Sequence, residues 1–193
     1  MKYLTSLIAM LAFIQGANAV EKQDIKTAVF AGGCFWCVES DFDKVDGVVS
    51  TLSGYAGGDE VNMDYKTISK GNTEHAEVVK VLYDANKISY LELLNIFFKT
   101  VDPTVRDKQF CDVGRQYRTA IFYQTEEEKT LAQEVRKRVE EKLNTHIYTE
   151  ISPLKNFNPA EDYHQDYYKK NPLRYKYYRY SCGRDKRVKQ LWG

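Results

Sequence analysis

Residues Gly32-Gly33-Cys34-Phe35-Trp36-Cys37-Val38-Glu39 follow a short apolar run, Thr27 to Ala31, and this junction decides the fold. The apolar run predicts a buried strand, and the two glycines allow a sharp exit from it. A helix then begins at Cys34 and runs to about Lys44. Free N–H groups and the positive end of the helix dipole favour a thiolate at that position. We therefore expect Cys34 to have a lowered pKa and to act as a nucleophile near neutral pH.

Two large apolar side chains, Phe35 and Trp36, come directly after this cysteine. Such residues most often belong to a protein core. Beside an activated thiol they can instead form the wall of a pocket for a small apolar group. The residues alone leave both interpretations open.

The first nineteen residues have the pattern of a secretory signal peptide. Lys2 supplies the charged start, Leu4 to Ile14 the apolar centre, and Ala17-Asn18-Ala19 the small-residue cleavage site. The apolar run is too short for a comfortable membrane span. We expect cleavage near Ala19, export to the periplasm or beyond the cell, and no stable membrane insertion afterwards.

Residues 20–193 are predicted to form a single domain that acts as a monomer. Lys2 is the only charge in the leader, so this part of the chain has 27 basic and 27 acidic residues. The balance argues against nucleic acid as a partner.

Four cysteines in an exported chain suggest disulfide chemistry; they are Cys34, Cys37, Cys111 and Cys182. By number alone two static bridges are the simplest interpretation. The position of Cys34 argues against it, because a helix start that activates a thiol suits an inert bridge poorly. One Cys-x-x-Cys pair without a second pair gives no zinc pattern, so we expect neither a metal nor a cofactor.

The order of predicted elements indicates an α+β fold. Alternating and apolar segments predict strands at Thr27–Ala31, Val48–Tyr55, His75–Tyr83, Arg118–Tyr123 and Thr149–Ile151. Helices are expected from Cys34, from the capping box Ser89-Tyr-Leu-Glu92 and from Thr125 to about Asn144, with a helical turn between Asp64 and Gly71. The central β-α-β-β-α-β order is typical of a ferredoxin-like split βαβ sheet with its helices on one face.

The chain from Glu161 onward is rich in tyrosine interleaved with lysine and arginine. This composition occurs where single-stranded nucleic acid is bound. We favour a long irregular tail that wraps the free face of the sheet with its tyrosine rings, because the exported chain carries no net charge.

Several motifs, in order along the chain, resemble those of the peptide-methionine (S)-S-oxide reductases, the A-type methionine sulfoxide reductases. They are Gly33-Cys-Phe-Trp-Cys-Val-Glu39, Gly54-Tyr-Ala-Gly-Gly58, His75-Ala-Glu77, Gln116-Tyr-Arg118 and Ala160-Glu-Asp-Tyr-His-Gln165. Together they span nearly the whole chain after the leader. The resemblance implies repair of oxidised proteins under oxidative stress by reduction of methionine S-sulfoxide, free or in proteins.

The resemblance also implies roles for individual residues. Cys34 corresponds to the nucleophile and Glu77 to the acid that protonates the sulfoxide oxygen. Tyr65 and Tyr117 correspond to the hydroxyls that hold this oxygen, and Asp112 to a carboxylate that orders water and the site. Phe35 and Trp36 correspond to the pocket for the substrate's S-methyl group.

The chemistry explains these residue types. Oxide is a poor leaving group, so a carboxylic acid must stay protonated until it acts on the sulfoxide oxygen. Burial beside aromatic rings raises the pKa of a glutamate to that end. Without the motif, Glu77 would be an exposed residue of an amphipathic strand, and His75 on the same face would be a second candidate acid.

Attack by Cys34 leaves methionine and a sulfenic acid on the cysteine. A second thiol then condenses with the sulfenic acid, and a thioredoxin-like donor reduces the disulfide. We rank Cys182 first as the resolving thiol because its tail resembles the family's resolving segment. Cys37, one helical turn from Cys34, and Cys111, beside Asp112, are the alternatives, with Cys111 expected to face away from the site.

The sequence is also compatible with two other classes of function. A thioredoxin-like dithiol oxidoreductase would use Cys34 and Cys37 on protein disulfides, but it would have no counterpart of Glu77 or of the two tyrosines. A non-catalytic secreted module would hold two structural disulfides and no free thiol.

Overall fold

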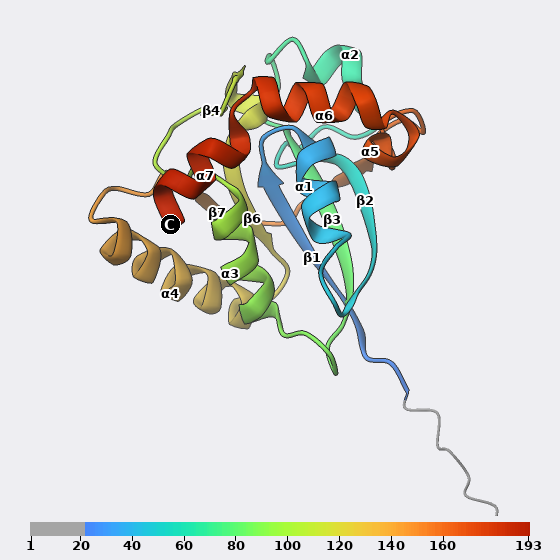
Figure 1. Cartoon of the computed structure of the whole chain (residues 1–193). Helices are drawn as coiled ribbons and strands as arrows, with labels where there is room; N and C mark the ends of the chain where they lie inside the picture. Colours follow the sequence, from blue (N-terminus) through green and yellow to red (C-terminus); the bar gives the residue numbers. More distant parts are fainter. Residues whose placement is uncertain (1–21) are drawn as a thin grey trace, which may run out of the picture.

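A six-stranded sheet forms the centre of the protein in a computed structural model, which describes residues 22–193 (Figure 1). The predicted leader, residues 1–19, lies outside the described residues. The strands are β1 (Ile25–Gly32), β2 (Val48–Ala56), β3 (Ala76–Asp84), β6 (Thr119–Tyr123), β7 (Glu150–Pro153) and β8 (Phe157–Pro159). Their order is β7-β6-β1-β3-β2-β8. All pairs are antiparallel except β6 with β7, so the fold is a mixed α+β fold, as expected.

Helices on one side of the sheet enclose the main core. They are α1 (Phe35–Phe42), α3 (Tyr90–Thr100) and α4 (Glu126–Leu143). The predicted capping box at α3 is confirmed: the Ser89 hydroxyl accepts from the Glu92 N–H, and the Glu92 carboxylate accepts from the Ser89 N–H. The ring of Phe30 on β1 stacks between Phe42 and Phe97, with centroids 5.2 and 5.1 Å away. This packing fixes α1, and with it the reactive turn, on the sheet.

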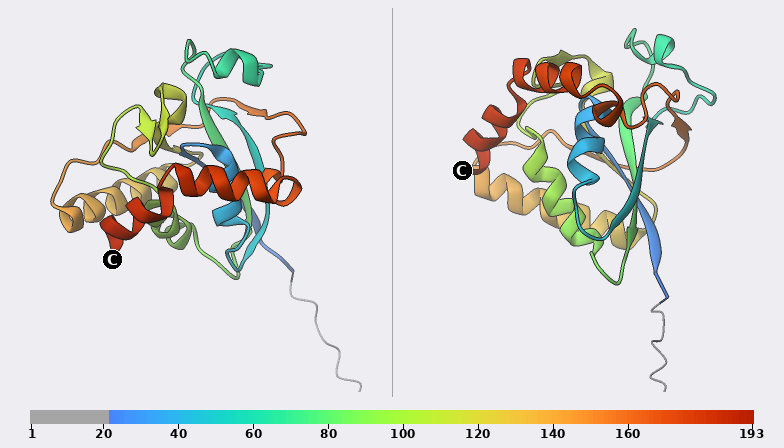
Figure 2. Two further views of the ribbon diagram at one scale, coloured as in Figure 1. Left: turned by 45° about the horizontal axis from the view of Figure 1, so that its top comes forward. Right: turned by 45° about the vertical axis from the view of Figure 1, so that its right-hand side comes forward.

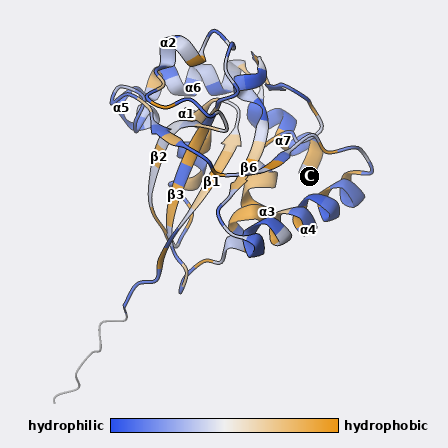
Figure 3. Cartoon of the chain, turned by 180° about the vertical axis from the view of Figure 1, so that it is seen from behind, coloured by the Kyte–Doolittle hydropathy of each residue, from blue (hydrophilic) through white to orange (hydrophobic). Residues whose placement is uncertain are grey.

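The opposite face of the sheet carries mainly small residues, with Val29, Ala31, Val78 and Ala120 among them. Because β7 and β8 pair at opposite edges of the sheet, the chain between them must cross this face, and Leu154 and Phe157 pack on it. Figure 3, which views the molecule from behind, shows this crossing segment. The segment between β7 and β8 therefore packs on the face that the C-terminal tail was expected to cover.

The C-terminal tail is helical, so the expectation of an irregular tail is wrong. It forms α5 (Tyr167–Lys170), α6 (Pro172–Ser181) and α7 (Arg184–Trp192). Proline at the start of α6 favours that helix, and Gly183 turns the chain between α6 and α7 with a φ of 68°. In both views of Figure 2, α6 lies over α1 and not over the opposite face of the sheet.

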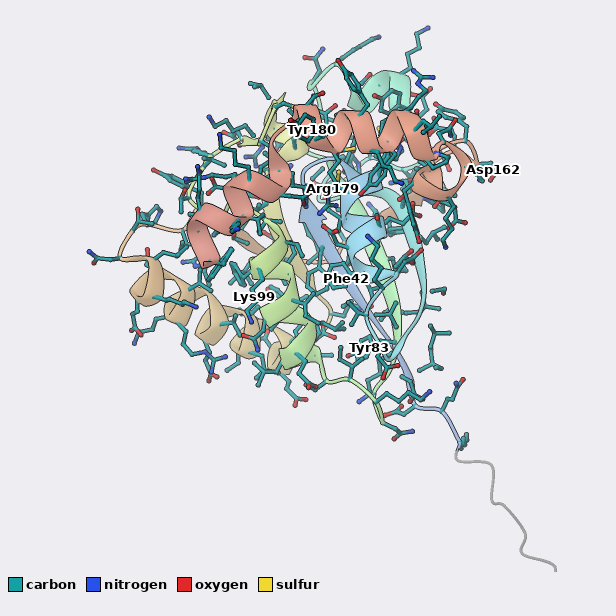
Figure 4. The ribbon with its side chains drawn as sticks, in the orientation of Figure 1. Phe42, Tyr83, Lys99, Asp162, Arg179 and Tyr180 are labelled. Carbon is teal, nitrogen blue, oxygen red and sulfur yellow. A yellow bond between two sulfur atoms is a disulfide. The ribbon has the colours of Figure 1, made fainter. Side chains whose placement is uncertain are left out.

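Two arginines of the tail explain this placement. Arg179 donates to Asp41 on α1 at 2.7 Å, and Arg187 donates to Asp102 at 2.6 Å. Figure 4 shows Arg179 on the side of α6 that faces α1. These ion pairs attach the tail to the helical side of the molecule, and not to the free face of the sheet.

The segment between α3 and β6 carries three predicted site residues, Cys111, Asp112 and Tyr117. A small hairpin pairs β4 (Lys108–Gln109) with β5 (Asp112–Val113), and a 3-10 helix, η1 (Arg115–Tyr117), follows. The short helix α2 (Tyr65–Ile68), which begins with the predicted site residue Tyr65, follows β2. Within residues 22–193 no helix is both long and apolar enough to span a membrane.

Candidate active site

The turn between β1 and α1 places the Cys34 thiol at a pocket. Gly33 has a φ of +82°, and a Cβ atom there would lie 2.5 Å from the Cβ of Gln109. Only glycine fits this conformation and this space without displacing Gln109. Cys34 occupies the N-cap position of α1 and is 6% exposed. Gly33 therefore allows the sharp turn from β1 into α1 that the sequence predicts.

The pocket at this turn has a volume of about 210 Å³. It is lined by Cys34, Phe35, Trp36, Tyr65, Glu77, Asp112, Tyr117 and Tyr178. All seven residues predicted to bind or react with the substrate are in this group. They come from α1, α2, β3, β5 and η1, so the fold joins segments far apart in the sequence. Tyr178, from α6, is the one lining residue that the sequence analysis did not assign.

Glu77 has the properties of a buried acid. Its side chain enters the pocket from β3 at 3% exposure, and its Oε2 accepts the backbone N–H of Phe35 at 3.0 Å. Burial raises its pKa to about 8, although the bond from Phe35 acts in the opposite direction. Glu77 is therefore protonated at neutral pH and able to donate a proton.

His75, the other candidate acid, is not a lining residue of the pocket. It is fully buried beside Glu60, whose backbone oxygen lies 3.0 Å from Nε2. The arrangement thus agrees with Glu77 as the acid.

The thiol of Cys34 does not have the lowered pKa that its helix position suggested. Burial, a hydrogen bond to Cys37 and the negative field of Glu77 raise the pKa of Cys34 well above its ordinary value. Conversely, the hydrogen bond from Cys34 lowers the pKa of Cys37 to about 7. The expectation failed because the first N–H of α1 is occupied by Glu77 and because the thiol is out of water.

Two phenols and a carboxyl complete the polar side of the pocket. Burial raises the pKa of Tyr65 and of Tyr117, so both are neutral hydrogen-bond donors. Burial also raises the pKa of Asp112, while hydrogen bonding from Tyr178 and the positive charge of Arg184 oppose that rise. Neutral donors of this kind stabilise negative charge that develops on a bound oxygen.

The aromatic side of the pocket is braced by residues of the motif near position 164. The Trp36 indole stacks on Tyr167 with centroids 3.7 Å apart, and its Nε1 donates to His164 at 3.0 Å. His164 also lies against the rings of Phe35 and Tyr65, at 4.9 and 4.5 Å. Phe35 and Trp36 therefore both form the wall of the site, with Phe35 reaching into the core as well.

A second residue of the same motif positions Tyr65. The Glu161 carboxylate accepts the Tyr65 N–H at 2.8 Å and the Tyr55 hydroxyl at 2.9 Å. The sequence alone assigns no role to the residues of this motif. In the structure, Glu161 and His164 of this motif orient residues that line the pocket.

The other two cysteines are joined in a disulfide, Cys111 with Cys182, with a Cα–Cα distance of 4.9 Å. Cys34 and Cys37 are free and buried. Cys111 is exposed and does not line the pocket, although the next residue, Asp112, does. In the described part of the chain one group of possible metal ligands occurs, Cys111, Asp112 and Cys182. With both sulfurs in the disulfide, a single carboxylate remains, which is too few ligands for a metal site.

A buried cysteine beside a protonated carboxyl, two neutral phenols and an aromatic wall defines a cysteine-dependent enzyme. The sequence pattern of the family described as peptide methionine sulfoxide reductase matches residues 26–193. The chain is 50% identical over 177 residues to peptide methionine sulfoxide reductase MsrA 2 of Rhizobium meliloti, covering 92% of this chain and 87% of that protein. A relative of the same name from Caulobacter vibrioides is 42% identical over the full length of both proteins. The chain belongs to the peptide methionine sulfoxide reductase family.

Solved structures give the same result. Reduced Mxr1 from Saccharomyces cerevisiae superposes with a TM-score of 0.74 at 36% identity, over 77% of this chain and 86% of that one. Methionine sulfoxide reductase A of Corynebacterium diphtheriae superposes with a TM-score of 0.71 at 32% identity, over 79% of this chain and 78% of that one. Mxr1 from Saccharomyces cerevisiae in complex with Trx2 superposes with a TM-score of 0.54 at 26% identity, over 77% of this chain and 90% of that one.

Proposed function

We propose that this protein reduces the S epimer of methionine sulfoxide, free or in peptides and proteins, and that a thioredoxin-like dithiol regenerates it. One observation carries the proposal. The Cys34 thiol and the protonated carboxyl of Glu77 line the same pocket of about 210 Å³, with the aromatic wall of Phe35 and Trp36 beside them. Membership of the family supports the reduction of methionine sulfoxide, and the yeast Mxr1–Trx2 complex supports regeneration by a thioredoxin-like dithiol.

The reaction follows from these groups. The substrate's methyl group lies against Phe35 and Trp36, and its oxygen accepts hydrogen bonds from Tyr65 and Tyr117. Glu77 gives its proton to that oxygen while the Cys34 sulfur attacks the sulfoxide sulfur. The oxygen then passes to Cys34, so that methionine leaves reduced and Cys34 becomes a sulfenic acid.

Recycling requires a second thiol. Cys182 remains our first prediction for the resolving cysteine. Its bond to Cys111 supports this choice, because it holds the sulfur of Cys182 next to Asp112, a lining residue of the pocket. Attack by a free Cys182 on the Cys34 sulfenic acid releases water, and exchange with Cys111 then yields the Cys111–Cys182 disulfide and frees Cys34. Cys37 and Cys111 are the alternatives. Cys37 has its pKa lowered by a hydrogen bond from Cys34, and Cys111 is the partner of Cys182 in the disulfide.

A thioredoxin-like oxidoreductase is the second candidate, and the burial of its two cysteines counts against it. Cys34 and Cys37 are only 6% and 2% exposed. A dithiol that reduces protein disulfides must present its attacking sulfur to another protein. Reduction of insulin by the wild-type protein at a rate comparable to its sulfoxide reduction would favour this candidate.

The proposal extends to the protein's setting. We propose that residues 20–193 act as a monomeric catalytic domain that is exported after cleavage near Ala19, to a compartment where oxidants reach methionines directly.

We also interpret the central part of the fold as a ferredoxin-like split βαβ unit, formed by β1, α1, β2, β3, α3 and β6. The strand order β6-β1-β3-β2 and its antiparallel pairing support this interpretation.

The experiment compares the S and R epimers of methionine sulfoxide in a short peptide, with thioredoxin as donor. Wild-type protein should reduce the S epimer alone. Cys182→Ser, Cys37→Ser and Cys111→Ser are then assayed in single and multiple turnover. Loss of the resolving cysteine leaves the first turnover intact and stops later ones. Equal use of both epimers would contradict the proposed substrate. Normal cycling by Cys182→Ser, while Cys37→Ser or Cys111→Ser stops, would contradict the proposed resolving cysteine.

A further inference from the structure

Tyr178 is a third phenol at the site, brought there by the C-terminal tail. It lines the pocket together with Cys34 and Asp112. Its hydroxyl donates to Asp112 Oδ2, and it faces the same pocket as the Cys34 thiol, whose pKa it lowers through hydrogen bonding. Its ring lies edge-on to Trp36, with centroids 5.8 Å apart. The phenol therefore connects the pocket of the reactive sulfur with a carboxylate.

The neighbouring tyrosines of α6 show that this placement is specific. Tyr177 and Tyr180 are 75% and 85% exposed, whereas Tyr178 points into the pocket. Two connections hold it there. The Cys182 N–H donates to the Tyr178 backbone oxygen at 2.9 Å, and Cys182 is bonded to Cys111, the residue before Asp112. The disulfide and the Tyr178–Asp112 hydrogen bond thus tie α6 to the same hairpin.

The reaction needs such a bridge because the buried thiol is protonated at rest. Attack on the sulfoxide requires the Cys34 proton to leave. Glu77 cannot take this proton, because it holds its own until it gives it to the substrate oxygen. Burial keeps the phenols neutral by raising their pKa. The charged or titratable groups around Cys34 and Asp112 are Glu77, Cys37, Tyr65, Tyr117, Tyr178 and Arg184.

Two acceptors remain, Cys37 and Asp112. Cys37 is 2% exposed, so a proton placed on it has no direct exit to water. Asp112 is only half-buried, and it already accepts a hydrogen bond from the phenol that contacts the thiol. Arg184 and Tyr178 stabilise its carboxylate form at rest. Asp112 can therefore receive the proton and pass it to solvent.

We propose that Tyr178 is a catalytic residue that relays the Cys34 proton to Asp112 as the thiol attacks the sulfoxide. The thiol proton moves to the Tyr178 oxygen while the phenol proton moves to Asp112 Oδ2. Cys34 becomes a thiolate, Asp112 a neutral carboxyl, and Tyr178 is neutral before and after. Asp112 then loses the proton to water, which restores the carboxylate. The sulfoxide step rests on the proposed function, whereas the ionisation of the thiol does not.

The test compares Tyr178→Phe with Tyr177→Phe, an exposed tyrosine one residue away on the same helix. Phenylalanine keeps the ring packing and removes the relay oxygen. In single turnover with the S epimer, Tyr178→Phe should react about tenfold or more slowly, and Tyr177→Phe should stay within about twofold of wild type. Asp112→Asn should also be slow. Because relay members act as a unit, the double variant should lose no more than the slower single variant.

A second measurement needs no sulfoxide. Alkylation of Cys34 by iodoacetamide, followed by mass spectrometry from pH 5 to about pH 11, reports thiolate formation. Tyr178→Phe should move the midpoint of this profile upward, because the thiolate loses a donor, and Tyr177→Phe should not. The relay is overturned if Tyr178→Phe has both the single-turnover rate and the alkylation midpoint of the wild type. It is also overturned if the loss of rate in the double variant equals the product of the losses in the two single variants. If wild-type protein reduces no sulfoxide, the proposed function fails, and the alkylation profile still decides the contact of Tyr178 with the thiol.

Discussion

Replacing Glu77 by glutamine tests the protonated acid at the centre of the site. The amide has nearly the same shape, and its oxygen can still accept the Phe35 N–H. Burial raises the pKa of Glu77 to about 8 from an ordinary value of 4.5. Between these two pH values the folded protein keeps a proton that the unfolded chain has lost. The stability of the wild type, measured relative to Glu77→Gln, therefore falls as pH rises through this window, by a total on the order of 5 kcal/mol.

Urea unfolding at pH 5, 7 and 9, followed by tryptophan fluorescence, gives this difference. We expect wild type and variant to be closest in stability at pH 5, and the variant to be clearly the more stable protein at pH 9. Glu134→Gln, exposed on α4, is the matched control and should change stability by about 0.5 kcal/mol or less throughout. At pH 7 the Glu77→Gln variant should also lose a factor on the order of 10² in single-turnover rate. An unchanged stability difference from pH 5 to pH 9 would refute the reasoning.

Three further predictions concern the turn, the aromatic wall and the leader. Gly33→Ala should destabilise the protein by about 2 to 4 kcal/mol, because its Cβ would meet Gln109 at 2.5 Å at a φ of +82°. Gly183→Ala, with a φ of +68° and no atom within 4 Å, is the control and should cost about 1 kcal/mol in urea unfolding. His164→Phe removes the acceptor of the Trp36 indole, so KM should rise severalfold with a smaller effect on kcat; a change in kcat alone would argue against a role in shaping the pocket. N-terminal sequencing of the active protein should begin at Val20, and Met1 on active cytoplasmic protein would refute export.

Much of the site could be predicted from the sequence because the motifs carry residue types that the chemistry needs. The strand, double glycine and cysteine define the reactive turn by local conformation alone. Glu77 could be assigned only through its motif, since nothing local shows that its end of β3 is buried. The pKa of Cys34 was predicted in the wrong direction, because the helix N-terminus is visible in the sequence whereas its occupation by Glu77 is a long-range contact.

The tail was the least predictable part. Its tyrosines and basic residues suggest a surface covering, because composition alone does not show which of them face inward. Leu173, Tyr177 and Tyr180 are exposed, whereas Tyr175 and Tyr178 face inward. That division depends on where α6 lies, and α6 is placed by ion pairs with residues over a hundred positions earlier, such as Arg179 with Asp41. No local pattern in the tail specifies those partners.

The most direct test of the central claim is to observe the oxygen on Cys34. A variant with Cys37, Cys111 and Cys182 all replaced by serine keeps the nucleophile and removes every resolving thiol. One equivalent of the S epimer should then yield one equivalent of methionine and a protein heavier by one oxygen atom. Peptide mapping should place that oxygen on Cys34, in a form trapped by dimedone. Methionine formed without an oxygen on Cys34, or formed equally fast after Cys34→Ser, would contradict the account.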